Sequence, residues 1–310
     1  MNLETLPLLL RDEPALTQVA GRANAVLAVP EPARALVIAA LARRSQARPY
    51  VIVTPTGSAA GQLYDDLAQY LPTHEVALFP AWETLPFERV SPAVETMGRR
   101  LEVLWKLASP ERCPLVVLAG VRALLQRLGP ADNNVEPIRV HRGAVLEPDA
   151  LLERLVHLGY RREELVEHRG EVARRGAIVD VFPSTADEPI RIDLWGDEVD
   201  RLTSFSVADQ RSTHELEEAL VFPARELLVD EAVRARAASL VAREPWGREH
   251  WERLAEGSIF DGMESWLPWL ADDERILTDV LPEGARVVLV EPRRMRDRAG
   301  DLLAEEDDLA

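Results

Sequence analysis

Lysine is nearly missing from this sequence. Lys106 is the single lysine among 310 residues, so almost all basic side chains are arginines. A nucleotide-hydrolysing loop of the pattern G-x-x-x-x-G-K-[S/T] places its lysine on the β- and γ-phosphates of the nucleotide. Lys106 lies instead in the helical pattern RLEVLWKLA, with no glycine loop before it. The sequence therefore argues against nucleotide hydrolysis by this segment.

Cysteine is equally scarce, and the histidines do not have the spacing of metal ligands. With Cys113 alone, neither an intrachain disulfide nor a cysteine-rich metal site can form. The six histidines show no H-x-x-x-H or H-E-x-x-H pattern, and no G-x-S-x-G nucleophile motif is present. We therefore expect no catalytic residue, no metal and no bound cofactor in this chain.

Long apolar segments are missing as well. No apolar run approaches the roughly 18 residues that a membrane helix needs, and the N-terminus lacks the basic lead-in of a signal peptide. The formal net charge of −17 argues against strong nonspecific binding to DNA, because proteins that grip phosphates usually present a basic face. We expect a cytoplasmic protein with no membrane partner.

The stretch VIVTPTGSAAGQLYDDL (51–67) has the layout of a phosphate-binding loop. An apolar run, a loop of small residues and a helical pattern follow one another here. The backbone amides of Ser58 to Gly61 open the helix and could hold an anion weakly. A tight strand-to-helix turn explains the same residues, and we prefer that interpretation.

The first 130 residues alternate between apolar runs and helical patterns. The runs predict strands at 24–29, 50–54, 75–80 and 114–120, separated by helices such as 31–44. This alternation is typical of βαβ units, in which helices cover both faces of a parallel sheet. We therefore predict an α/β fold for this part of the chain.

The pattern changes after residue 134. One helical segment is followed by strands without helices between them, and the run Ile190-Arg191-Ile192-Asp193-Leu194 alternates before a turn at Gly196-Asp197. This predicts an antiparallel α+β domain inserted after the parallel one.

The last part of the chain is mostly helical. Helices dominate from about residue 226, and ARVVLVEP (285–292) predicts a strand that returns to the first sheet. The tail begins a helix and stops, which suggests a chain cut from a longer one. The predicted domains are 1–132, a degenerate RecA-like nucleotide fold; 133–222, the α+β domain; and 223–310, the mostly helical domain.

The stretch GYRREELVEHRGEVARRGAIVDVFP (159–183) concentrates arginine in an acidic chain. If 164–170 pairs with 172–182 as a hairpin about Gly170, Arg162 and Arg175 would come close on one face. Exposed arginines on a rigid sheet are good docking anchors, because the planar guanidinium binds carboxylates and is enriched in interface hot spots. A solvated strand face, neutralised by neighbouring glutamates, explains the same residues equally well.

Two further clusters are interpreted as structural. The carboxylates of DLWGDEVD (193–200) gather at a turn, where acidic residues are common. Four tryptophans with helical spacing could stack on bases, but no basic residues interleave with them, so we interpret them as core or domain-interface packing. They are Trp246, Trp251, Trp266 and Trp269.

Three stretches resemble a known family. They are ALFPAWETLPFERVSPAVETMGRRLEVLWKL, HLGYRREELVEHRGEVARRGAIVDVFPSTADEPIRIDLWGDEVDRLTSFSVADQRS and GSIFDGMESWLPWL. In this order they resemble the N-terminal region of the bacterial transcription-repair coupling factors (Mfd), and the similarity runs over nearly the whole chain. The same region is similar to the front part of the excision-repair helicase UvrB.

The resemblance implies a fold and a role. In the family this segment forms a UvrB-like module: a RecA-like domain, an inserted middle domain that binds UvrA, and a helical domain with a returning strand. The full factor recognises RNA polymerase stalled at DNA damage, displaces it with ATP and recruits UvrA. The domains that bind polymerase and DNA, and those that use ATP and magnesium, are expected downstream of this segment.

The resemblance also implies a binding site. The family's middle domain holds UvrA with arginines of the YR and RRG segments and with the aromatic residue of FP. These carry over to Arg161, Arg162, Arg175 and Phe182. Where UvrB has a further arginine this chain has Ala173, and we expect Arg174 to compensate.

Two departures from UvrB bear on function. The phosphate loop of UvrB falls near LAVPEPARALV (27–37), which has neither glycine nor lysine here. The long tyrosine-rich hairpin with which UvrB grips damage is replaced by the short WETLPFERVSP (82–92), which has no tyrosine. We therefore expect that this segment has lost both nucleotide binding and direct damage recognition.

Three hypotheses follow. The chain is an interaction module that docks UvrA; or a UvrB-like helicase fragment that still binds a nucleotide or DNA in nucleotide excision repair; or a self-inhibitory module whose docking face is covered by a distant C-terminal domain. Titration with ATP-Mg distinguishes the first two, because the first expects no heat.

Overall fold

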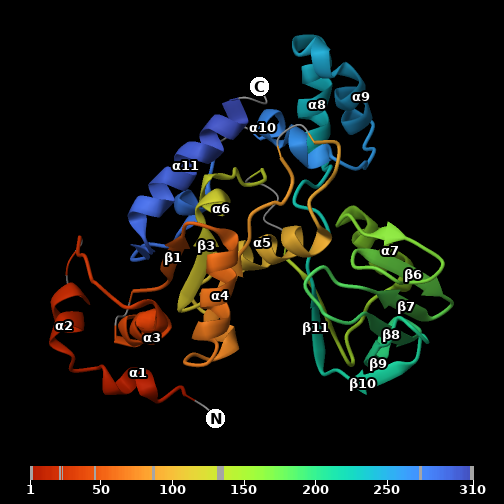
Figure 1. Ribbon diagram of the computed structural model, residues 1–310. Helices are drawn as coiled ribbons and strands as arrows, with labels where there is room; N and C mark the ends of the chain where they lie inside the picture. The colour runs from red at the N-terminus through yellow and green to blue at the C-terminus, as the bar shows by residue number, and fades with distance from the viewer. Residues whose placement is uncertain are drawn as a thin grey trace. The chain divides into compact units, whose positions relative to one another are not determined.

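The computed structural model describes residues 3–20, 22, 24–44, 47–85, 88–130, 136–271 and 274–307 (Figure 1). Contacts between residues divide the chain into two compact units. The first unit comprises Met1–Ala81, Lys106–Leu128 and Arg275–Ala310, and the second comprises Trp82–Trp105 and Gly129–Glu274. The finer division into three domains stays a prediction.

The first unit is built on a parallel sheet of four strands in the order β12-β1-β3-β2. Every neighbouring pair is parallel, and the first residues of β1 and β12, Tyr50 and Arg286, are in register. The predicted α/β class and the returning strand are thereby confirmed. The strands are β1 (Tyr50–Thr54), β2 (Val76–Phe79), β3 (Val116–Gly120) and β12 (Arg286–Leu289).

The expected strand at 24–29 is wrong. Residues 25–30 carry no regular secondary structure, and Val26 is exposed. The place beside β1 is taken by β12 from the far end of the chain. The apolar run therefore predicted a strand that the sheet does not contain.

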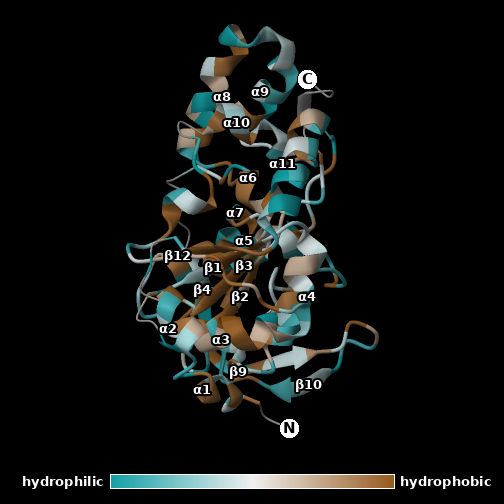
Figure 2. Ribbon diagram, turned by 60° about the vertical axis from the view of Figure 1, so that its left-hand side comes forward, coloured by the Kyte–Doolittle hydropathy of each residue, from teal (hydrophilic) through white to brown (hydrophobic). Residues whose placement is uncertain are grey.

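The core of the first unit lies between its sheet and the helices that follow the strands. β1 and β3 are buried along their whole length, and Figure 2 shows the strands of this sheet as hydrophobic. α4 packs against β1, β2 and β3. The helices are α1 (Leu6–Leu9), α2 (Pro14–Ala20), α3 (Arg34–Arg44), α4 (Gly57–Leu67), α6 (Val121–Leu125) and α11 (Pro292–Asp307), with 3-10 turns at Glu31–Ala33, Thr73–Glu75 and Leu277–Val280.

The second unit contains a sheet of six strands in the order β10-β9-β8-β7-β6-β5. It is antiparallel except that the two-residue strand β5 runs parallel to β6. A separate pair, β4 with β11, is also antiparallel. The strands are β4 (Ile138–His141), β5 (Arg161–Arg162), β6 (Glu171–Arg175), β7 (Ile178–Val181), β8 (Ile190–Trp195), β9 (Glu198–Phe205), β10 (Ser212–Glu215) and β11 (Glu218–Val221).

Helix α7 (Pro148–His157) covers one face of this sheet. The Glu147 carboxylate caps the helix by accepting hydrogen bonds from the backbone N–H groups of Asp149 and Ala150, at 3.0 and 2.6 Å. Leu151 and Leu155 pack into a core with the apolar residues of β6 to β9, where each buried leucine contributes about 1.5–3 kcal/mol. The alternation predicted from the sequence is confirmed, since Ile190, Ile192 and Leu194 all lie in this core.

Three of the remaining helices of the second unit, α8, α9 and α10, form a core with the tryptophan cluster. Trp251 is fully buried, and its ring lies 5.0 Å from that of Trp266, while Trp246 and Trp269 are 5.2 Å apart. The interpretation as packing is confirmed, although Trp246 is half-exposed. The helices are α8 (Glu231–Arg243), α9 (Arg248–Ala255), α10 (Leu267–Leu270) and α5 (Val94–Leu107), whose last two residues belong to the first unit, with 3-10 turns at Pro245–Gly247 and Met263–Trp266.

Within the described ranges, no helix combines the length and the apolar character needed to cross a membrane.

Candidate docking site on the six-stranded sheet

The register of the six-stranded sheet sorts its side chains onto two faces. Val172, Val179 and Ile192 point toward α7 and are buried there. Their neighbours along each strand point the other way, and several of these are charged. We call this second side the arginine face; its members are Arg161, Glu171, Arg175, Asp180 and Arg191.

The predicted hairpin about Gly170 is wrong. The hairpin is formed by β6 and β7 and turns at Gly176, whose φ of +63° suits a glycine. β5 lies beside β6 in the parallel sense, with Arg162 opposite Val172, so Arg162 lies on the α7 side. Arg162 and Arg175 are therefore on opposite faces, and the prediction that they share one face is also wrong.

Arg161 and Arg162 occupy the edge strand of the sheet. Arg161 Nη2 donates to Glu171 Oε1 at 3.2 Å, and the other oxygen of Glu171 accepts from the backbone N–H groups of Glu167 and His168, both at 2.8 Å. Arg162 is exposed, and no described residue forms a hydrogen bond or ion pair with its side chain. An unpaired guanidinium on an edge strand is available to an external carboxylate.

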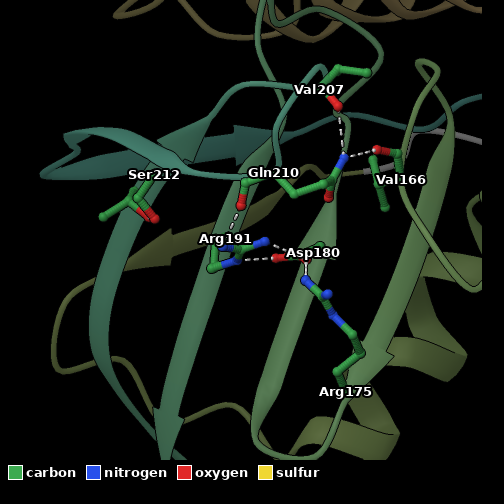
Figure 3. A network of polar contacts seen from close by, with 8 residues as sticks. Val166, Arg175, Asp180, Arg191, Val207, Gln210 and Ser212 are labelled. Carbon is green, nitrogen blue, oxygen red and sulfur yellow. Dashed lines mark hydrogen bonds and ion pairs between the residues drawn. The ribbon is translucent and has the colours of Figure 1, made fainter.

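Arg175 shares a buried carboxylate with Arg191 (Figure 3). Asp180 is 2% exposed; its Oδ2 accepts from Arg175 Nη2 at 2.6 Å, and its two oxygens accept from Arg191 Nε and Nη2 at 2.7 and 2.9 Å. This hydrogen bonding to Asp180 raises the pKa of the Arg191 guanidinium. Arg175 remains 47% exposed, so its outer half faces solvent.

Arg174 lies on the α7 side of β6. Its Nη1 pairs with Asp149 of α7, and its Nε donates to the Gly176 carbonyl at 3.1 Å. Ala173, the preceding residue, is buried on the arginine face opposite Asp180. Arg174 thus points away from the place that an arginine at 173 would occupy.

Phe182 is buried at 8% exposure, in a small cluster with Val166, Ala173 and Phe205. The guanidinium of Arg169 lies over its ring, 5.3 Å from the centroid. Arg169 is itself held, since its Nε donates to the Ala186 carbonyl at 2.8 Å. The ring therefore supports the loop from β5 to β6, and Arg169 covers it.

Sequence reasoning missed Asp180, Arg191 and Gln210. Asp180 had a signal, because an ionised side chain inside the apolar run AIVDVF must be paired when it is buried. Its partner Arg191 is in register with it on β8, which only the pairing of β7 and β8 reveals. No feature of the sequence pointed to Gln210, whose backbone is in the left-handed region, with φ of 60°, in the loop before β10.

The carboxylates of the β8–β9 hairpin gather no metal-ligand set. Burial raises the pKa of Asp193, whose neighbours in register are Ile178 and Arg201. In the described part of the chain, no group of three or more histidine, cysteine, aspartate or glutamate side chains could hold a metal ion.

The stretch 51–67 forms a tight turn between β1 and α4, as preferred above. Thr56 Oγ1 accepts from the Ala59 backbone N–H at 3.2 Å and caps α4. The end of β3 lies close against this turn, because a Cβ at Gly120 would lie only 2.8 Å from Gly57 N. The close approach is at the carboxyl ends of β1 and β3, the edge at which α/β sheets usually bind ligands.

The two spans that depart from UvrB have simple structures. Residues 27–30 are without regular structure, and a 3-10 turn then leads into α3. The span 82–92 forms neither helix nor strand over its described residues; Pro86 and Phe87 lie outside them.

The family described as the UvrB interaction domain matches residues 138–227, which include every candidate site residue. Transcription-repair-coupling factors from Mycobacterium tuberculosis, Bacillus subtilis and Escherichia coli are 44%, 31% and 32% identical to the chain over 89%, 88% and 85% of its length. The chain is a relative of the transcription-repair coupling factors.

The predicted resemblance to the coupling factors is thereby confirmed, and the chain contains a region that matches the UvrB interaction domain family. It spans between 22% and 25% of the length of these three coupling factors. What the whole factors do is therefore carried to this chain only as a proposal.

Proposed function

We propose that this chain is an interaction module that docks the excision-repair protein UvrA. In the complete coupling factor, it recruits UvrA to RNA polymerase stalled at damage. The ATP-driven translocase, with its magnesium, and the contacts to polymerase and DNA belong to the parts of the factor outside this chain. The chain itself carries no catalytic step and binds no cofactor in this proposal.

One observation carries the proposal: the sheet that the UvrB interaction family matches bears guanidinium groups with unused donors. Arg162 is exposed without a partner among the described residues, and Arg175 engages Asp180 through Nη2 alone. Arginine forks bind carboxylates and are enriched at interface hot spots. Each of the two arginines contributes about 2 kcal/mol if its charged hydrogen bonds become buried in the complex.

The positions of these arginines define how the partner must approach. Arg162 lies on the edge strand on the α7 side, whereas Arg175 lies on the arginine face at the end of β6. Arg162 is in register with Val172, three residues from Arg175, which corresponds to about 10 Å along a strand. A partner that binds both must therefore wrap around the β5 edge.

Charge reversal tests this proposal. We expect the double variant Arg162→Glu/Arg175→Glu to stay folded and to lose UvrA binding measured by calorimetry. The variant Arg142→Glu/Arg154→Glu is the control, because it changes two exposed arginines of the same unit and has the same net charge. Wild-type affinity in the first variant, or equal loss in both, would refute the assignment.

A further inference from the structure

We propose that Asp180 is the positioning residue of this docking site, and that its buried carboxylate holds the Arg175 guanidinium in the orientation that the partner meets. The inference rests on the proposed function above and assigns a role to a residue that itself stays covered. Asp180 is 2% exposed and cannot touch a partner directly.

The two arginines on Asp180 have different roles. Arg191 is held on all sides: Nε and Nη2 bind both oxygens of Asp180, Nη1 donates to the Gln210 carbonyl at 3.1 Å, and the guanidinium lies 4.8 Å from the Phe205 ring centroid. Because this side-on pairing uses both carboxylate oxygens, it fixes the plane of the Asp180 carboxylate. Arg191 is thus the anchor of the cluster.

Arg175 is the exposed member of the cluster. Its Nη2 donates to Asp180 Oδ2 at 2.6 Å, whereas Nε and Nη1 form no hydrogen bond with any described residue. Two guanidinium groups share one carboxylate, so the cluster carries one positive charge in excess. That excess charge is presented at Arg175 because Arg191 is only 13% exposed. A carboxylate of the partner would complete the cluster.

The same carboxylate links the segments that build the site (Figure 3). From Asp180 the contacts run through Arg191 to the backbone of Gln210. The side-chain amide of Gln210 then donates to the carbonyls of Val166 and Val207, at 3.2 and 3.0 Å. Val166 belongs to the loop between β5, which carries Arg161 and Arg162, and β6, which carries Arg175.

This arrangement lowers the cost of binding. A free arginine side chain loses rotamer entropy when it is fixed in an interface. Arg175 is already restrained by Asp180, so less freedom is lost when the partner arrives. Arg162 has no such restraint and serves as an internal comparison.

The test is the substitution Asp180→Asn, which keeps the shape and removes the charge. We expect the affinity of the chain for UvrA to fall roughly tenfold, equivalent to about 1.4 kcal/mol. In an Arg175→Ala background the same substitution should cause no further loss, because it acts through Arg175. A merely structural role would lower affinity equally in both backgrounds and would overturn the inference.

The matched control is Asp187→Asn. Asp187 also pairs with an arginine, Arg169, but it is 92% exposed and is no part of the cluster. We expect wild-type affinity from this variant. A tenfold loss from Asp187→Asn as well would show a general charge effect and would overturn the role of Asp180.

A second measurement needs no variant of the chain. Nitrogen-detected NMR of the arginine side chains in the wild-type chain reports rotation about the Cζ–Nε bond. We expect hindered rotation for Arg175 and Arg191 and free rotation for Arg162. Free rotation of Arg175 together with intact UvrA binding would overturn the role of Asp180 alone, whereas no UvrA binding by the wild type would overturn the proposed function.

Discussion

Arg162 and Arg175 lie on opposite faces of one sheet, Arg162 on the edge strand β5 and Arg175 at the end of β6. They have no hydrogen-bonding partner in common in the described part of the chain, since Arg175 pairs with Asp180 and Arg162 pairs with none. They therefore meet different parts of the partner surface.

This separation predicts that their contributions to binding add. We expect Arg162→Ala and Arg175→Ala each to weaken UvrA binding by about 2 kcal/mol, and the double variant to equal the sum within about 0.5 kcal/mol. Calorimetric titration of the four proteins of the cycle measures the coupling. A coupling above about 1 kcal/mol would mean that the two side chains act on one partner group, contrary to the register of β5 and β6.

The structure of the first unit predicts that the chain does not bind a nucleotide. Its segment 27–37 lacks the glycines and lysine of a phosphate loop, and the turns at Gly57 and Gly120 close on each other. We expect no heat above dilution when ATP-Mg is titrated into the chain. Saturable heat with a stoichiometry near one would refute this and favour the helicase-fragment hypothesis.

Much of the architecture could be predicted because its signals are local. Alternation of apolar runs and helical patterns predicted β1, β2 and β3 and the parallel sheet, and the period of two in β8 predicted which side chains enter the core. The same local signal misled at 24–29, because a run of apolar residues does not say whether the segment joins a sheet.

The arrangement of the candidate site could not be predicted from the sequence, because it depends on pairings between distant segments. The sides on which Arg162 and Arg175 lie depend on the register of β5 and β6, and a shift of one residue exchanges the faces. The pairing of Asp180 with Arg191 likewise depends on which strands are neighbours. The pairing of distant strands produces no periodic pattern in the sequence. Residue types could therefore suggest that the arginines form a binding site, but not how they are arranged.

A buried ion pair predicts a large effect on stability in the second unit. Arg100 and Glu226 are 0% and 1% exposed; Nε–Oε2 is 2.8 Å and Nη2–Oε1 is 3.1 Å. Glu226→Gln removes the negative charge that pairs with the buried Arg100 guanidinium, which costs about 3–5 kcal/mol. Urea unfolding measures this loss. Glu252→Gln, at an exposed position of α9, is the control and should change stability by less than about 0.5 kcal/mol.

Removing the Tyr160 hydroxyl is expected to cause a smaller loss of stability. Its hydroxyl donates to the Phe222 carbonyl at 2.7 Å and accepts from the Ser184 backbone N–H at 3.1 Å, and burial raises its pKa. Tyr160→Phe leaves the Ser184 N–H without this acceptor, so we expect a loss of about 1–3 kcal/mol in the free energy of unfolding. Tyr70→Phe, in the first unit, should have no measurable effect; equal stability of the two variants would contradict the assigned bonds.

Glu291 predicts a pH-dependent contribution to the stability of the first unit. It lies between β12 and α11 with φ of 54°, and its carboxylate accepts from Arg34 Nη2 at 2.7 Å and from Arg294 Nη1 at 2.5 Å. These hydrogen bonds, that of Arg34 first, lower the pKa of Glu291 from its ordinary value of 4.5. A carboxyl group with a lowered pKa in the folded state stabilises it above the unfolded pKa, and this stabilisation is lost as the pH falls through the lowered value.

The variant Glu291→Gln isolates this contribution, because the other carboxyl groups titrate in both proteins. We expect the wild type to be more stable than the variant at pH 7, with a difference that stays constant down to about pH 5.5 and shrinks as the pH falls below the ordinary glutamate pKa. Urea unfolding at a series of pH values measures the difference. Glu31→Gln is the control, because Glu31 is exposed and its Oε1 lies 3.9 Å from Nη1 of the same Arg34. A difference that grows as the pH falls would have the wrong sign and would show that the Arg34–Glu291 pair does not stabilise the folded chain.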